Sequence, residues 1–317
     1  MSATAVGNAG ATIQDIPELL ARARREVANA IVGHSDAVEL MLLAALARGH
    51  VLIEGPPGTA KTLLAQAMAR VLGAKFQRVQ FTPDTSPTDL IGTVTMRGGE
   101  VFLERGALFT NVLLADEINR TPPRVQAALL EAMQERHVSV KGRTFFIDPP
   151  FFVMATQNPY EHEGVYAITE SQLDRFIFKI DLEYGTEASE VEMLALPHRG
   201  VIPDMLGEVG SLLGERGFLV AQEAVDEIAV PAEITKLIVQ IVRYTRTAAD
   251  VEIGASPRAA LHLMTAAKAR ALASGRTAVQ VEDITFLAPY VLGHRIRCED
   301  PHAVASAAIA AGVAALG

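Results

Sequence analysis

One stretch near the start of the chain constrains the fold more than any other: Gly55-Pro56-Pro57-Gly58-Thr59-Ala60-Lys61-Thr62. It follows a short apolar run, residues 51–53, that is typical of a buried parallel strand. It precedes residues 63–69, which favour a helix and contain no helix breaker. A glycine-rich turn between a strand and a helix can bind phosphate, because its N–H groups converge and the helix N-terminus carries partial positive charge. The stretch therefore predicts a phosphate-binding loop.

Two side chains of this loop carry specific roles. Lys61 is placed to reach the β- and γ-phosphates, and the Thr62 hydroxyl is placed to hold Mg²⁺. Ala60 departs from the general G-x-x-x-x-G-K-[ST] pattern, and its methyl group narrows the backbone angles available there. An ordinary Gly-Pro turn is the alternative, but the Lys-Thr pair at the required offset argues against it. The residues expected to contact a nucleotide here are Gly55, Pro56, Pro57, Gly58, Thr59, Ala60, Lys61, Thr62 and Leu63.

A pair of acids forms the second motif. Asp116 and Glu117 follow an apolar run, residues 111–115, so we expect them at the carboxyl end of a strand, where ligands bind in open α/β sheets. There, Asp116 can hold Mg²⁺, usually through water, and Glu117 can polarise an attacking water as general base. Neighbouring acids are common on surfaces, so the pair alone is a weak signal. The strand before it and the phosphate loop upstream are what indicate a catalytic role.

Three more side chains complete the candidate site. Asn158 follows another apolar run, residues 151–155, and could orient a water or contact the γ-phosphate, although Asn-Pro turns are common. Arg175 precedes a last strand, residues 176–180, and Arg258 begins a later helix. A guanidinium can neutralise charge on a phosphoryl group, although most arginines are solvated surface charges. The positive charge of Arg258 at a helix N-terminus is unfavourable, because that end of the helix dipole is also positive. A compensating negative charge, such as phosphate, is therefore expected nearby.

Strand and helix signals alternate up to about Asp181, and only helix signals follow. This order predicts a parallel sheet covered on both faces, then a small helical bundle beyond a boundary at residues 200–204. Two hairpins, around Gly98-Gly99 and Lys141-Gly142, interrupt the core as surface decorations or functional inserts. The expected helices are 16–30, 37–48 with Ser35 as N-cap, 125–136, 187–196, 232–247, 257–274 and 281–292. The expected sheet strands are 51–53, 76–81, 111–115, 151–155 and 176–180.

Composition narrows the class of protein. The net charge of the 317 residues is −9, which disfavours non-specific nucleic-acid binding. The lone Cys298 excludes an internal disulfide and fits a reducing cytoplasm. It stands at helical i, i+4 spacing from His294, where a structural role is expected rather than zinc, and Glu161-His162-Glu163 is not expected to bind metal. Residues 1–12 are expected to be a disordered tail without a signal sequence, and the longest uncharged run, 303–317, is too short for a membrane span.

Six stretches together resemble the MoxR family of AAA+ ATPases, over roughly residues 28–297. They are Gly-Pro-Pro-Gly-Thr-Ala-Lys-Thr from residue 55, Leu-Leu-Ala-Asp-Glu-Ile-Asn-Arg from 113, Glu-Ala-Met-Gln-Glu-Arg from 131, Ala-Thr-Gln-Asn-Pro from 155, Gln-Leu-Asp-Arg-Phe from 172 and Gly-Ala-Ser-Pro-Arg-Ala from 254. Ala60 is usual in this family. One departure is Ile168-Thr169-Glu170-Ser171, where the family often has Leu-Pro-Glu-Ala.

The resemblance implies an α/β fold: a P-loop AAA+ core with a five-stranded parallel sheet between helices, then a small all-α lid domain. The domains would be residues 1–27 (tail and helix), 28–200 (core with two hairpin inserts) and 201–317 (lid). It further implies ATP and Mg²⁺ as cofactors, with Thr62 and Asp116 at the metal, and a homo-oligomer, usually a hexameric ring. By motif position, residues 55–62 are Walker A, Asp116-Glu117 is Walker B, Asn158 is sensor 1, Arg175 is an arginine finger facing the next subunit, Arg258 is sensor 2, and Gly33 lies in a loop near adenine.

The family likeness also implies a chaperone-like function in the cytoplasm, in which ATP hydrolysis remodels protein clients. Such work often involves a partner with a von Willebrand factor A domain and the assembly or activation of metalloenzymes. One alternative is a nucleic-acid motor, since the hairpins carry Arg97, Lys141 and Arg143, although acids lie beside them. Another is a nucleotide-gated scaffold with little turnover, against which the intact Glu117 and Arg175 argue.

Overall fold

The structure is a computed structural model that describes residues 15–31, 33–97, 100–140, 142–159, 164–195, 198–199, 202–203 and 209–316. Several features expected from the sequence lie outside these residues. They are the tail at residues 1–12, the turn residues Gly98, Gly99 and Lys141, the Glu161-His162-Glu163 run, and residues 200, 201 and 204 of the expected domain boundary.

A five-stranded sheet in the order β2-β5-β8-β1-β9 forms the centre of the core. Its strands are β1 (Val51–Glu54), β2 (Phe76–Gln80), β5 (Val112–Asp116), β8 (Phe152–Gln157) and β9 (Phe178–Asp181). All neighbouring pairs are parallel, and β1 lies between β8 and β9. The predicted fold class, with all five strands, is therefore confirmed.

Helices cover both faces of this sheet. Alternate side chains of each strand point to opposite faces, so each strand contacts helices on both sides. Val51 and Ile53 of β1 pack with α2 (Ser35–Leu46) and α3 (Lys61–Leu72), whereas Leu52 packs with α5 (Pro123–Glu135). The remaining helices of this part of the chain are α1 (Ile16–Ala30), α4 (Pro87–Ile91), α6 (Glu170–Leu173), α7 (Glu187–Ala195) and α8 (Gly214–Asp226). The central strand β5 is buried along its whole length, whereas the edge strand β2 has no fully buried residue.

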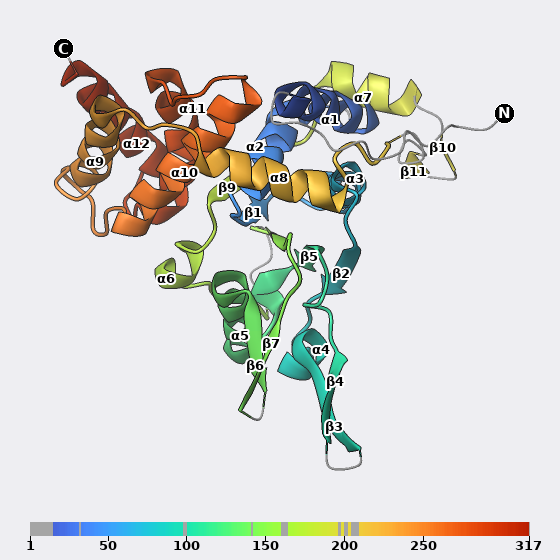
Figure 1. The fold of residues 1–317 in the computed structure, drawn as a ribbon. Coiled ribbons are helices and arrows are strands. Elements are labelled where there is room, and N and C mark those ends of the chain that lie inside the picture. Colours follow the sequence, from blue (N-terminus) through green and yellow to red (C-terminus); the bar gives the residue numbers. More distant parts are fainter. Residues whose placement is uncertain are drawn as a thin grey trace.

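The C-terminal part of the chain is a helical lid beside the core (Figure 1, orange to red). It consists of α9 (Ala232–Tyr244), α10 (Pro257–Ala273), α11 (Val281–Leu292) and α12 (Pro301–Ala314). Helix α10 packs against α9 and α11 and also against α1, α2 and α8, so one apolar cluster runs from the core into the lid. Helices α4, α6, α8 and α12 were not expected. Gly214 and Gly217 obscure α8 in the sequence, and the alanine-rich α12 lacks an apolar stripe.

The two predicted hairpins are present and project in the same direction from the core (Figure 1). The first pairs β3 (Gly92–Arg97) with β4 (Glu100–Arg105), and the second pairs β6 (His137–Val140) with β7 (Arg143–Phe146), both antiparallel. Gly92 has φ +97°, and a Cβ there would lie 1.9 Å from the carbonyl oxygen of Glu104. A glycine is therefore required where the first hairpin begins.

Two local expectations are wrong. Helix α2 begins at Ser35 itself, whose hydroxyl donates to Asp36 at 3.4 Å, so Ser35 is not the N-cap. Beyond Asp181 there are two strands, β10 (His198–Arg199) and β11 (Ile202–Pro203), which form an antiparallel pair too short to leave a sequence pattern. No helix among the described residues is long and apolar enough to cross a membrane.

Candidate active site

The phosphate loop, residues 55–62, connects the end of β1 to the start of α3. Gly58 and Ala60 have φ values of +86° and +57°, so both take the left-handed conformation. A Cβ at Gly55 would lie 2.5 Å from the carbonyl oxygen of Leu182, whereas a Cβ at Gly58 would meet no atom within 4 Å. The loop is thus tightly packed where it leaves the sheet and open beside Gly58, as a phosphate cradle requires.

The ammonium group of Lys61 lies over this loop. Its Nζ donates to the carbonyl oxygens of Gly55 at 2.6 Å and Pro56 at 2.9 Å. Burial lowers the pKa of Lys61, while the charges of Asp116 and Glu117 act to raise it. The lysine and the two acids therefore share one electrostatic environment. Thr62 and Leu63 follow in the first turn of α3 and are partly accessible.

The two acids at the end of β5 have different partners. Asp116 Oδ1 accepts a hydrogen bond from the Thr156 hydroxyl at 2.5 Å, and Oδ2 accepts one from the Arg78 guanidinium at 2.7 Å. Glu117 has φ +59°, and its Oε2 accepts from Arg120 at 3.0 Å. The left-handed backbone at Glu117 thus directs the two carboxylates to different partners.

Asn158 directly follows β8, the strand between β1 and β5. The phosphate loop, the Asp116-Glu117 pair and Asn158 therefore leave three adjacent parallel strands at one sheet edge. The oxygen groups of Thr62 and Asp116 are of the kind that Mg²⁺ prefers, so the residues present suit this ion.

The structure also places three polar residues at this edge that the sequence reasoning missed: Arg78, Arg120 and Thr156. Arg78 lies two residues before the end of β2, whose last residue, Gln80, pairs with Asp116. That register was not readable from the sequence. Thr156 stands inside the recognisable Ala-Thr-Gln-Asn-Pro run and could have been noticed.

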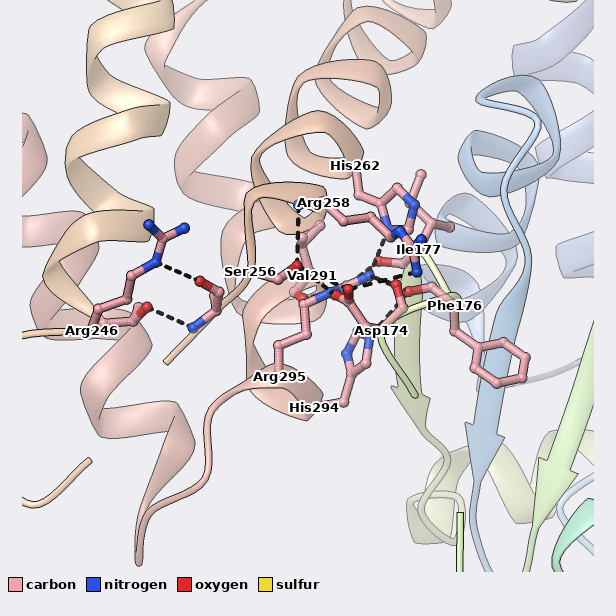
Figure 2. Close-up of polar contacts among 12 residues, drawn as sticks. Asp174, Phe176, Ile177, Arg246, Ser256, Arg258, His262, Val291, His294 and Arg295 are labelled. Carbon is pink, nitrogen blue, oxygen red and sulfur yellow. Dashed lines mark hydrogen bonds and ion pairs between the residues drawn. The ribbon is translucent and has the colours of Figure 1, made fainter. Parts of the chain in front are cut away.

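The two predicted arginines do not join this group. Arg175 precedes β9, so it lies toward the amino edge of the sheet, separated from the phosphate loop by the length of β1, about 13 Å for four residues. Its buried Nε has no hydrogen-bond partner among the residues that the structure describes. The guanidinium of Arg258, at the start of α10, lies 3.8 Å from Asp174 Oδ2 (Figure 2). Asp174 therefore supplies the negative charge that the helix position of Arg258 called for.

Gly33, His294 and Cys298 lie among residues of the fold. Gly33 has φ +88°, and a Cβ there would lie 3.3 Å from Ser189 of α7. His294 belongs to the short 3-10 helix η4 (Gly293–Arg295), and its Nε2 contacts the carbonyl oxygen of Phe176 at 3.1 Å. The chain is extended at Ile296, so the expected helical spacing to Cys298 is wrong. Over the described ranges, no three His, Cys, Asp or Glu side chains gather as a metal site.

Comparisons with known proteins show which proteins the chain resembles. Residues 50–178 match the "ATPase family associated with various cellular activities (AAA)", and residues 243–311 match the "AAA lid domain". "Chaperone MoxR1" of Mycobacterium tuberculosis is 46% identical over 288 residues, which cover 87% of this chain and 75% of the relative. "Protein MoxR" of Methylorubrum extorquens is 34% identical over 311 residues, which cover 91% of this chain and 90% of the relative.

A solved structure shares the whole architecture. The crystal structure of a candidate ATPase from Cytophaga hutchinsonii superposes with a TM-score of 0.84 at 33% identity, covering 94% of this chain and 95% of that one. Taken with the sheet order, the phosphate loop and the relatives above, this likeness means that the chain belongs to the MoxR family of AAA+ ATPases.

Proposed function

We propose that the chain is a Mg²⁺-dependent enzyme that hydrolyses ATP to ADP and phosphate, works as a hexameric ring and remodels protein clients. The observation that carries this proposal is the division of the candidate residues between two sheet edges. The phosphate loop, Glu117 and Asn158 lie at the carboxyl edge, whereas Arg175 precedes β9 on the opposite side. A γ-phosphate bound by one subunit would then meet the Arg175 guanidinium only from its neighbour, in addition to Arg78 and Arg120 at its own sheet edge.

Each group at the carboxyl edge has a distinct role in this proposal. Lys61 binds the β- and γ-phosphates in place of the loop carbonyls it now contacts. Thr62 and Asp116 would hold Mg²⁺, which neutralises phosphate charge when bound. Glu117 accepts the proton of the attacking water, Asn158 orients that water, and the Arg120 contact fixes Glu117 Oε2. Gly33 is assigned to the neighbourhood of the adenine.

Arg175 and Arg258 supply positive charge to the γ-phosphate of the adjacent subunit. A guanidinium donated in trans can raise turnover by about 10³-fold or more. Arg175 as a whole is partly exposed, as a contact with a neighbouring subunit requires. An isolated subunit would therefore bind ATP and hydrolyse it slowly.

The two hairpins are assigned to the client. Their exposed apolar side chains include Met96, which is 70% exposed, and Phe146, which is 69% exposed. Arg105 and Asp148 form an exposed ion pair of 3.4 Å, so the two hairpins lie next to each other where they leave the core. The relative named a chaperone supports a protein client. A von Willebrand factor A partner, metalloenzyme maturation and a cytoplasmic location extend this proposal.

Mixing two inactive variants tests the shared site. Glu117→Gln subunits lose the base, and Arg175→Ala subunits lose the finger. In mixed rings, some interfaces pair an intact Glu117 with an intact Arg175, so steady-state ATP hydrolysis should reappear. If co-assembly is demonstrated by native mass spectrometry and no activity returns at any ratio, the trans arrangement is wrong. Full-rate hydrolysis by dilute monomer would also contradict it.

A further inference from the structure

A buried guanidinium from the lid binds the main chain on both sides of Arg175. The Arg295 side chain, at the end of η4, is only 2% exposed. Its Nε donates to Asp174 Oδ1 at 2.7 Å, and its Nη2 donates to the carbonyl oxygens of Asp174 and Phe176 at 2.9 and 2.6 Å. These carbonyls belong to the residues directly before and after Arg175 (Figure 2). One lid side chain thus holds the main chain on both sides of the arginine.

The same carboxylate is connected to Arg258. The Ser256 hydroxyl donates to Asp174 Oδ2 at 2.9 Å and accepts from the backbone N–H of Arg258 at 3.1 Å, as the N-cap of α10. One turn into α10, His262 Nδ1 lies 2.6 Å from Arg295 Nη2. Asp174, Ser256, His262 and Arg295 therefore form one polar cluster, here the Asp174 cluster (Figure 2). Arg175 directly follows Asp174 in the chain, and Arg258 contacts its carboxylate.

The cluster resists separation for electrostatic reasons. Burial lowers the pKa of Arg295 to about 10, and Asp174 opposes that shift, so the guanidinium stays charged at neutral pH. A buried charge is costly without its partners, because protein replaces the water that solvated it. The planar guanidinium can bind a carboxylate and several carbonyls together, which a lysine ammonium cannot reproduce. The lid and the segment around Arg175 are thus expected to move as one body.

We propose that Arg295 is a positioning residue for Arg175 and Arg258. It holds both arginines in the geometry with which they meet the nucleotide of the neighbouring subunit, so the lid of one subunit governs hydrolysis in the next. This inference rests on the proposed trans role of Arg175. It adds a residue, Arg295, that touches no nucleotide itself and acts through the Asp174 cluster.

Replacing Arg295 by Met removes the guanidinium and keeps much of its volume. The turnover number of Arg295→Met assemblies should fall about 10²-fold, as expected for a catalytic group displaced by about 1 Å. The KM for ATP should stay within about twofold, because the phosphate loop of the same subunit is untouched. Arg297→Met is the matched control. Arg297 also reaches from the lid to the core, 3.0 Å from Glu170, but it is exposed and does not contact Asp174. This control should keep near wild-type turnover.

Mixed assemblies then separate a positioning role from a general defect. Arg295→Met subunits keep an intact Glu117 and present a displaced finger, so they should recover activity when mixed with Glu117→Gln subunits. They should not recover with Arg175→Ala subunits, because no interface in that mixture has a properly held finger. Arg295 would thereby fall into the same complementation group as Arg175.

Other outcomes overturn the inference. Recovery with Arg175→Ala would place the defect in the subunit's own nucleotide site. Failure to recover with Glu117→Gln, while co-assembly is observed and the Glu117→Gln with Arg175→Ala mixture is active, would make Arg295 a purely structural residue. If that reference mixture is itself inactive, the trans proposal fails independently of Arg295. Should Arg295→Met not fold, Asp174→Asn removes the carboxylate charge with little change of shape, and the same mixtures apply.

Discussion

The hydroxyl of Thr156 on β8 lies 2.5 Å from Asp116 Oδ1 on the neighbouring strand β5. The Thr156 hydroxyl oxygen also accepts a hydrogen bond from the backbone N–H of Glu117 at 2.8 Å. One fully buried hydroxyl therefore fixes both acids of the candidate active site, the first through its carboxylate and the second through its main chain.

Thr156→Val should weaken both the fold and the reaction. The substitution keeps the shape but leaves the largely buried Asp116 carboxylate and the Glu117 N–H short of a partner, which costs about 1–3 kcal/mol of unfolding free energy. Urea denaturation measures this loss, and the Mg²⁺ dependence of ATP hydrolysis should shift because Asp116 is less well oriented. Thr156→Ser keeps the hydroxyl and is the control. A Val variant with wild-type stability and turnover would contradict this role.

Lys61→Ala and Glu117→Gln should separate binding from hydrolysis. Lys61 contributes the cation of the phosphate loop, so its loss should abolish binding of a fluorescent ATP analogue. Glu117→Gln keeps the side-chain shape without the base, so it should bind the analogue and fail to release phosphate. If the Gln variant released phosphate at the wild-type rate, the assignment of the base would be wrong.

Ala60→Gly should stabilise the protein. Ala60 has φ +57°, a conformation that costs an L-residue roughly 1 kcal/mol or more and glycine almost nothing. Part of the gain is offset by the larger entropy of glycine in the unfolded chain, so a net increase of about 0.5 kcal/mol in unfolding free energy is expected. Ala65→Gly, inside α3, should lower it by about 1 kcal/mol through helix propensity and further through the loss of a fully buried methyl group. Equal destabilisation by both would show that the Ala60 methyl contributes favourable packing.

The core could be predicted from the sequence because its signals are local. Most strands of the sheet begin as a short apolar run followed by polar residues, whereas β2 is mostly polar, and each hairpin has two alternating runs around a turn. Helices with weak local signals were missed. Helix α8 carries Gly214 and Gly217, yet Phe218 and Val225 bury its inner face, so packing outweighs the low propensity of glycine.

The candidate site was predictable only in part for a related reason. The phosphate loop, Asp116, Glu117 and Asn158 follow strands directly, and parallel strands bring such residues to one edge. The partnership of Arg295 with Asp174 joins residues 121 positions apart and depends on how the lid packs on the core. No local pattern encodes such a contact. Arg258 likewise gained its partner, Asp174, only from the tertiary structure.

Met96→Ser with Phe146→Ser should uncouple the hairpins from the client. Both side chains are largely exposed, so basal ATP hydrolysis and the melting temperature should change little. The stimulation of hydrolysis by permanently unfolded, carboxymethylated lactalbumin should fall several-fold. Val239→Ser changes an exposed apolar residue of α9 and should retain that stimulation. Equal loss of basal and stimulated activity in the hairpin variant would instead make the hairpins structural parts of the core.

His262 makes stability depend on pH. Burial, reinforced by the charges of Arg295 and Arg258 and opposed by Asp174, lowers the pKa of His262 to about 3. The unfolded histidine has its ordinary pKa of 6.5. Below this value the unfolded chain takes up a proton that the folded chain does not, so protonation favours unfolding. The contribution of neutral His262 to stability is therefore fully present above pH 6.5 and is lost progressively as the pH falls toward 3.

His262→Gln should flatten this dependence. At pH 5 the lost contribution amounts to about 2 kcal/mol, from roughly 1.4 kcal/mol for each pH unit below 6.5. A glutamine can still accept the hydrogen bond from Arg295 but takes up no proton. The difference in unfolding free energy between pH 7.5 and pH 5, measured by urea denaturation, should thus be about 2 kcal/mol smaller in the variant than in the wild type. Burial also lowers the pKa values of His50 and His294, which remain in both proteins. The unfolding free energy of the variant therefore still depends on pH, but less than that of the wild type. An unchanged difference would mean that His262 takes up its proton in the folded state as readily as in the unfolded chain, and that its contact with Arg295 is not maintained in solution.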